Sequence, residues 1–259
     1  MTHIKTVFDF QAEVGLTKHM GNLPATRELV KFCQILPDYC VLDVGSGAGR
    51  TPVYLAKQYD VRMVGVDIHP GMVAASRALA RREKLEGRAI FRQADAQDLP
   101  FEDDFFDAVI AESVTAFTPN QQQALREYVR VLKPGGFLGM NESTYLHSNP
   151  PALIVTWVSQ EAAMFARFHT RQGWQVLMKN AGLEVMTARV FPLDVRRETV
   201  QTMRRYGVRG LVRTWSRTLG VYVTHPEVRQ IMKQGASDAP AGLVDYFGYG
   251  LYVGRKPDD

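Results

Sequence analysis

The chain has 259 residues, of which 46% are hydrophobic and 22% charged, a composition typical of a soluble globular protein of one large domain or one domain with insertions. No stretch approaches 18 uninterrupted apolar residues and residues 1–5 begin no leader pattern, so we expect a cytoplasmic protein without a membrane span. The two cysteines, Cys33 and Cys40, form neither a disulfide framework nor a metal site and are expected to be buried packing residues.

The net charge of +4 is unevenly distributed. Residues 192–233 contain nine Lys and Arg against three acids, a local charge of +6, which leaves −2 for the remainder. The basic character therefore belongs to one segment.

The first part of the chain predicts alternating helices and strands. A helix is expected from about residue 24, with Leu29, Cys33 and Leu36 on one face and Pro37 at its end. Buried strands are predicted at 41–44 and 62–67, separated by a helix over 51–59.

A helix from 69 to a C-terminal cap at Gly87 follows, and then strands at 88–93 and 105–112. Asn120 is expected to cap the next helix, which ends before the fifth strand at 137–142. A helix capped by Gly182, a strand over 183–191 and a last, antiparallel strand from Phe247 complete the pattern.

This order predicts an α/β fold with a Rossmann-like, doubly wound, mostly parallel seven-stranded sheet. We expect a single domain over 1–259 with a cofactor-binding core at 38–142. Two insertions, a lid at 143–168 and a basic helical segment at 192–244, leave the carboxyl ends of strands, where open α/β sheets bind ligands. Their large apolar residues fit an apolar acceptor pocket, and they equally fit simple packing against the core.

A glycine-rich turn, Gly45 to Gly49, joins the first of these strands to its helix. Glycines let the backbone approach a ligand, and the free N–H groups of the helix start favour electron-rich atoms. Arg50 stands where the dinucleotide pattern G-x-G-x-x-G has its third glycine, so the turn alone also fits an ordinary strand-to-helix connection. Asp67 ends the second strand, 22 residues after Gly45, where a carboxylate can accept both hydroxyls of a ribose.

Together with segments 95–101, 106–110 and 131–137, this turn and Asp67 resemble the class I S-adenosylmethionine-dependent methyltransferases. The resemblance covers roughly residues 38–142 and is nearest to the branch with ubiquinone and menaquinone biosynthesis methyltransferase-like domains, the type 11 methyltransferase domain. It implies S-adenosylmethionine as the cofactor and methyl transfer by in-line displacement to a small, largely apolar acceptor. An oxygen, nitrogen or carbon acceptor is equally compatible.

The resemblance implies roles for individual residues. The glycine loop would wrap the methionine part, Asp43 would orient its ammonium, and Asp67 would bind the ribose hydroxyls. Ile68 would lie against adenine and Asp95 would read its edge. The expected cofactor-binding residues are Asp43, Gly45, Ser46, Gly47, Gly49, Asp67, Ile68, Met72, Asp95, Ala96 and Glu112.

A proton acceptor for the reaction is harder to assign. The catalytic candidates are Glu142, at the end of the fifth strand, and Tyr145 and His147 just after it. Histidine suits a phenol or enol acceptor near neutral pH, but a lone histidine is more often an ordinary loop residue. His169 is a weaker candidate still, and no metal cluster is expected. The resemblance implies a leader that folds over the cofactor pocket, which would make His19 a site residue, although an ordinary surface or capping histidine is the more common case.

Arg205, Arg209, Arg213 and Arg217 recur every four residues, although Gly207 weakens a helix there. Such a stripe is compatible with solvated surface, an acidic or lipid-like acceptor, or a peripheral membrane contact. No nucleic-acid partner is expected, and the oligomeric state is not readable. Three alternatives stay open: an RNA-directed methyltransferase, a non-catalytic nucleotide-binding module and an NAD(P)-dependent oxidoreductase.

Overall fold

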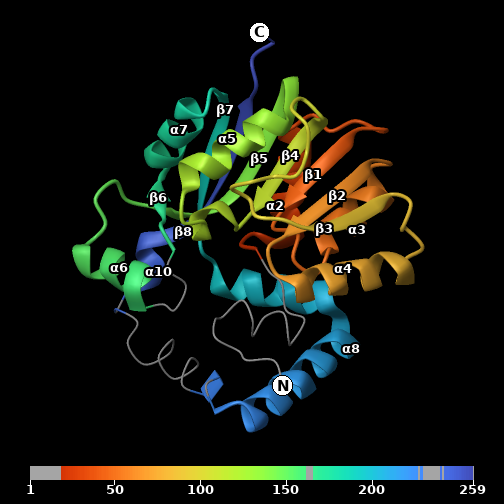
Figure 1. Ribbon diagram of the computed structural model, residues 1–259. Helices are drawn as coiled ribbons and strands as arrows, with labels where there is room; N and C mark the ends of the chain where they lie inside the picture. Colours follow the sequence, from red (N-terminus) through yellow and green to blue (C-terminus); the bar gives the residue numbers. More distant parts are fainter. Residues whose placement is uncertain (1–18, 162–165, 227, 230–239, 241, 259) are drawn as a thin grey trace.

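The computed structural model describes residues 19–161, 166–226, 228–229, 240 and 242–258, and its centre is one twisted sheet (Figure 1). The strand order is β3-β2-β1-β4-β5-β8-β7, with the short β6 paired to β5. Strands β1 to β5 run parallel, and β8 is antiparallel to both β5 and β7. The strands are β1 (Cys40–Val44), β2 (Arg62–Asp67), β3 (Ala89–Gln93), β4 (Phe106–Glu112), β5 (Leu132–Tyr145), β6 (His169–Thr170), β7 (Glu184–Pro192) and β8 (Phe247–Arg255). The predicted doubly wound sheet with an antiparallel last strand is confirmed.

Helices cover both faces of this sheet. They are α2 (Asn22–Phe32), α3 (Arg50–Gln58), α4 (Pro70–Arg82), α5 (Gln121–Val131), α6 (Ala152–Thr156), α7 (Arg171–Asn180), α8 (Val195–Thr224) and α10 (Leu243–Tyr246), with a 3-10 turn η1 (Thr115–Phe117) and a π-helical turn η2 (Trp157–Glu161). None of the helices in the described part of the chain is long and apolar enough to cross a bilayer.

Alternation along the strands divides the core into two layers. Leu42 and Val44 of β1 pack in the cluster that contains Tyr128 of α5 and Trp174 of α7. Val41 faces the opposite way, into the cluster formed by α2, α3 and α4. Because successive side chains of a strand point to opposite faces, one short apolar strand supports both layers, and each fully buried large apolar side chain contributes about 1.5–3 kcal/mol.

Two helix ends differ from the prediction. α2 ends at Phe32, so Leu36 lies beyond it and is 54% exposed, whereas Leu29 and Cys33 are buried as expected. α4 ends at Arg82, and Lys84 (φ 57) takes the left-handed conformation that was expected of Gly87. The predicted cap by Asn120 is confirmed, since its side chain accepts a hydrogen bond from the Gln123 N–H at 3.1 Å.

The helical insertions gather near one edge of the sheet, where the parallel strands end (Figure 1). β5 continues to Tyr145, so residues 143–145 belong to the sheet and not to the first insertion. α8 is interrupted at Gly207, whose φ of 63° and ψ of 170° are not helical, as the glycine there predicted. The side chains of Arg205, Arg209 and Arg213 lie outside the described residues.

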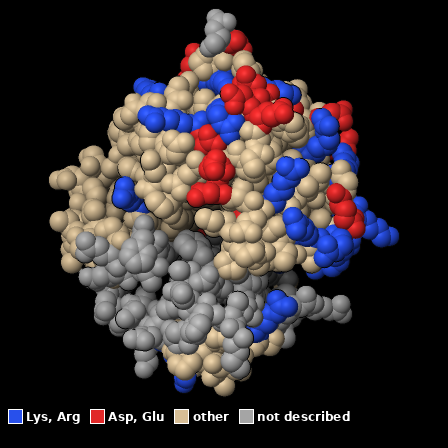
Figure 2. All heavy atoms as spheres, in the orientation of Figure 1, with Lys and Arg blue, Asp and Glu red and all other residues tan. Residues whose placement is uncertain are grey.

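The opposite edge carries charges of both signs, visible at the top of Figure 2. Ion pairs join Arg130 to Asp103 at 2.8 Å and Lys133 to Asp107 at 2.6 Å. Lys256 also pairs with Asp104 at 2.6 Å. Positive and negative side chains are paired there, so neither sign of charge dominates this edge of the sheet.

Candidate active site

The glycine turn after β1 has a backbone that only glycine adopts readily. Gly45 (φ 66), Gly47 (φ 53) and Gly49 (φ 76) are all left-handed. A Cβ added to Gly45 would lie 2.1 Å from Cγ2 of Val114, and one added to Gly49 would lie 2.7 Å from Cβ of Ser76. The turn is therefore held close both to the loop after β4 and to α4.

The turn is also tied to the end of β2. The Ser46 N–H donates to the Val66 carbonyl at 2.8 Å, and the Gly47 N–H donates to Oδ2 of Asp67 at 2.9 Å. Oδ1 of Asp67 accepts from the His69 N–H at 2.9 Å. Burial raises the pKa of the Asp67 carboxyl, and these two backbone bonds oppose the rise. Each oxygen still has acceptor capacity for a ligand hydroxyl.

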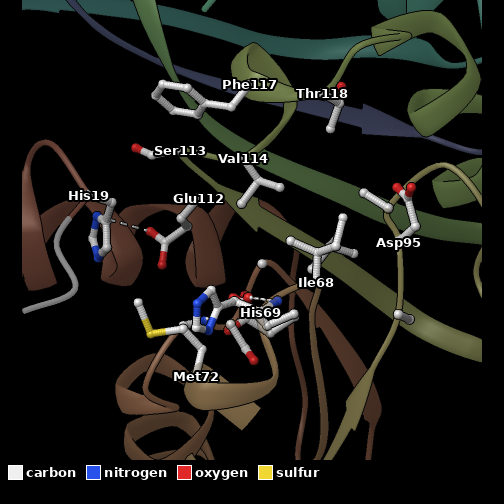
Figure 3. Close-up of a pocket in the computed structure, with 18 of the residues that line it drawn as sticks. His19, Ile68, His69, Met72, Asp95, Glu112, Ser113, Val114, Phe117 and Thr118 are labelled. Atoms are coloured by element: carbon white, nitrogen blue, oxygen red, sulfur yellow. Dashed lines mark hydrogen bonds and ion pairs between the residues drawn. The ribbon is translucent and has the colours of Figure 1, made fainter. Parts of the chain in front are cut away.

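Glu112, at the end of β4, lies in a network of polar side chains. Its carboxylate accepts hydrogen bonds from the hydroxyls of Thr26 at 3.0 Å and Thr51 at 3.1 Å. Nδ1 of His19 is 3.5 Å from Oε1 of Glu112, the pair joined by a dashed line in Figure 3. Three side chains, from α2, α3 and the turn before α2, thus orient one carboxylate at the cavity wall.

The loop after β3 supplies another carboxylate. Oδ1 of Asp95 accepts from the Gln97 N–H at 2.9 Å, which fixes the turn. Ile68, after β2, is 65% exposed although it lines the cavity. Figure 3 shows Ile68 and Asp95 on the same side of the cavity, away from His19. An apolar side chain beside a polar edge suits a flat heteroaromatic ring.

One cavity of about 470 Å³ joins these groups at the carboxyl edge of the sheet. Its walls come from the ends of β1, β2, β3 and β4, the start of α3, and His19. Asp43, Asp67, Asp95 and Glu112 line it together with Arg50. This excess of acidic side chains favours a positively charged ligand.

Comparisons with known proteins agree with this geometry. The model of a family described as a methyltransferase domain matches residues 42–140. An uncharacterized protein of Haemophilus influenzae is 30% identical over 177 residues, which are 67% of this chain and 70% of that protein. Phosphoethanolamine N-methyltransferase 1 of Arabidopsis thaliana is 28% identical over 162 residues, 62% of this chain and 32% of that protein. The chain belongs to the S-adenosylmethionine-dependent methyltransferases.

The solved structure of the [4+2]-cyclase SpnF has the same fold as this methyltransferase. It is 20% identical, covers 100% of both chains and gives a TM-score of 0.76.

The cofactor is S-adenosylmethionine, and the methyltransferase cavity fits it in three respects. A volume of about 470 Å³ is in the range of small-molecule sites, roughly 300–1,000 Å³. Gly45 and Gly47 line the cavity without a side chain, so the backbone itself forms that part of the wall. The acidic walls suit a ligand that carries a sulfonium and an ammonium.

Nearly all the residues that the sequence predicted for the cofactor come together here. Ten of the eleven line the cavity, and Gly49 is the N-cap of α3 just behind it. The sequence did not predict Ser113, Phe117 and Thr118, which line the cavity from the loop after β4. That loop follows the strand-four motif directly, and its position after a parallel strand was the available signal.

The three catalytic candidates lie elsewhere. Glu142 is fully buried and accepts from the N–H groups of Thr115 at 2.7 Å and Val114 at 3.2 Å, so it supports the cavity loop from behind. Burial raises its pKa to about 7. Tyr145 is 6% exposed and packs beside Phe168, while the exposed His147 contacts the Asp245 carbonyl through Nε2 at 3.2 Å. None of the three lines the cavity.

Proposed function

We propose that this methyltransferase transfers the methyl group to a small, largely apolar acceptor that enters beside the loop after β4. The observation that carries the proposal is the position of Val114, Phe117 and Pro119. They line the same cavity as Asp67 and Glu112 but come from a separate segment. Among the side chains of that segment that line the cavity, Ser113 and Thr118 are the polar ones. An apolar wall with a few polar groups suits an acceptor that is mainly hydrocarbon or aromatic.

Cofactor binding is assigned residue by residue. Asp67 accepts the ribose hydroxyls, Ile68 and Met72 pack against the adenine, and Asp95 with the Ala96 backbone binds the adenine edge. The loop Gly45 to Gly49, Asp43 and Glu112 hold the methionine part. When bound, S-adenosylmethionine supplies an activated methyl group, so the chain's residues need only orient the reactants and exclude water.

The reaction proceeds in this proposal by positioning. Because Glu142, Tyr145 and His147 lie outside the cavity wall, no proton transfer is assigned to them. Acceptors whose reacting group has a low pKa, or which release their proton to water after methyl transfer, fit such a site best. The resemblance to the quinone-biosynthesis branch stays a prediction, because its motifs belong to the cofactor half.

The relatives support a small-molecule acceptor. The Arabidopsis protein is named for phosphoethanolamine, a small amine, but the present chain spans only about a third of its length. An RNA acceptor finds less support, since the arginines of α8 whose side chains the structure describes, Arg196, Arg197 and Arg217, do not line the cavity.

The test measures binding first and transfer second. Calorimetric titration with S-adenosylmethionine, S-adenosylhomocysteine and NADH should show micromolar binding of the two sulfur compounds and none of NADH. The [4+2]-cyclase SpnF has this fold, so binding of the cofactor does not by itself establish methyl transfer. The second assay therefore measures S-adenosylhomocysteine formation with phenols, quinols, lipids and small amines. Turnover with polar anionic acceptors only, or with RNA only, would contradict the proposal.

A further inference from the structure

The turn before α2 has a constrained backbone and no cap of its own. Gly21 (φ 75) and Asn22 (φ 46) are both left-handed, and a Cβ at Gly21 would lie 2.7 Å from the ring of Tyr249. α2 has no side-chain cap from its N-cap residue and no acidic residue in its first turn. The Asn22 N–H donates to the His19 carbonyl at 3.4 Å and Pro24 has no N–H, so the backbone of this turn needs little capping. The positive end of the helix dipole still favours a carboxylate acceptor from elsewhere in the chain.

Glu198 of α8 is that acceptor. Its Oε1 accepts from the Gly21 N–H at 2.8 Å, and its Oε2 accepts from Nδ2 of Asn22 at 2.7 Å. The Glu198 residue is 5% exposed, so water does not replace these bonds. Removing the carboxylate would leave two buried donors unpaired.

The same turn carries His19 to the cavity. Nδ1 of His19 lies 3.5 Å from Oε1 of Glu112, and its Nε2 lies 3.3 Å from the hydroxyl of Thr26, which itself donates to Glu112. Nδ2 of Asn141 donates to the Met20 carbonyl at 2.7 Å. A shift of this turn would therefore move His19 and Thr26 relative to Glu112.

We propose that Glu198 is a positioning residue for the cofactor. By capping α2 from the basic insertion, it holds His19 and Thr26 against Glu112 and so sets the affinity of the cavity for the methionine part. The inference rests on the proposed role of Glu112. It also gives the insertion at 192–244 a function at the cofactor site, although Glu198 does not line the cavity.

The experiment compares full-length variants by calorimetric titration with S-adenosylhomocysteine, with thermal unfolding recorded in parallel. Glu198→Ala should weaken binding about tenfold at a temperature where the variant is folded. Loss of a helix cap and of a buried charged hydrogen-bond partner costs at least the free energy that corresponds to a tenfold change in affinity. Val200→Ala, at a 43% exposed position on the same helix, is the matched control and should bind like wild type. A lower melting temperature with unchanged affinity would reduce Glu198 to a structural role and overturn the proposal.

A reversed pair gives an independent test that does not depend on the alanine variant being folded. Asn22→Asp alone places two buried carboxylates against each other and should weaken binding about as much as Glu198→Ala. Combining it with Glu198→Gln lets the amide donate to the new carboxylate while its carbonyl accepts from Gly21, so affinity should return to within about threefold of wild type. Losses of affinity that simply add in the double variant would refute the pairing.

Wild-type protein that binds no S-adenosylhomocysteine would overturn the proposed function too, whereas normal wild-type binding with unaffected variants would overturn this inference alone.

Discussion

The backbone N–H of Gly47 donates a 2.9 Å hydrogen bond to the Asp67 carboxylate, joining the turn after β1 to the end of β2. The same carboxylate lines the cavity. One side chain therefore both fixes the shape of the glycine loop and lines the cavity. A change at Asp67 should act on both halves of the cofactor site.

Replacing Asp67 with alanine should weaken binding of S-adenosylhomocysteine at least tenfold. The ribose loses charged hydrogen bonds worth about 1.5–3 kcal/mol each, and the loop loses its anchor. Asp67→Asn should rescue little, because both carboxylate oxygens accept backbone N–H groups and an amide NH₂ would face one of them. Calorimetric titration measures the affinities. Asp104→Ala, at the opposite edge, is the control, and an Asp67→Ala variant with wild-type affinity would refute the ribose assignment.

A methyl group added to Gly45 should be more damaging than one added to Gly182. Both glycines are left-handed, with φ of 66° and 92°. A Cβ at Gly45 meets Val114 at 2.1 Å, whereas one at Gly182 meets nothing within 4 Å. Gly182→Ala should thus cost only the backbone strain, about 1–2 kcal/mol, and Gly45→Ala should cost more and also weaken cofactor binding. Denaturant unfolding and titration of both variants check this. Equal costs with equal affinities would show that the loop tolerates the clash.

Ten of the eleven residues that the sequence predicted for the cofactor line the cavity, whereas the three catalytic candidates do not. The apolar run in the sequence correctly predicted the bounds of β2, and with them the position of Asp67 at the end of this strand. The predicted fifth strand ended at Glu142, but β5 continues to Tyr145 because it pairs with β8 along its length. Glu142 is thereby inside the strand, with its carboxylate turned to the backbone of the loop in front. Such long-range pairing has no local signal in the sequence.

Substituting Glu142 with glutamine should change how stability depends on pH. Burial raises the pKa of this carboxyl to about 7, above its ordinary value of 4.5. The folded state therefore binds the proton more tightly than the unfolded state. The stabilisation is fully present below about pH 4.5 and is lost as pH rises through 7, with a slope up to about 1.4 kcal/mol per pH unit. The free energy of unfolding of wild type relative to Glu142→Gln should fall between pH 5 and 8. A constant difference over that range would contradict the buried, protonated carboxyl.

Phe117 belongs to the apolar wall proposed for the acceptor, and its substitution tests the proposed acceptor directly. The ring lines the cavity from η1 and packs near Phe168, with ring centroids 6.5 Å apart. The proposed cofactor contacts come instead from the ends of β1, β2 and β3 with the loops after them, and from Glu112 at the end of β4. Phe117→Ala should therefore raise KM for an apolar acceptor about tenfold, through loss of roughly 1–2 kcal/mol of apolar contact, and leave the affinity for S-adenosylhomocysteine within about twofold.

Ile90→Ala, at a 49% exposed position of β3 outside the cavity, provides the control. Steady-state kinetics on the acceptor found by screening, together with titration of the cofactor product, separates the two effects. If Phe117→Ala weakened cofactor binding and left KM for the acceptor unchanged, the wall would belong to the cofactor site, and the acceptor would have to enter from the side of His19.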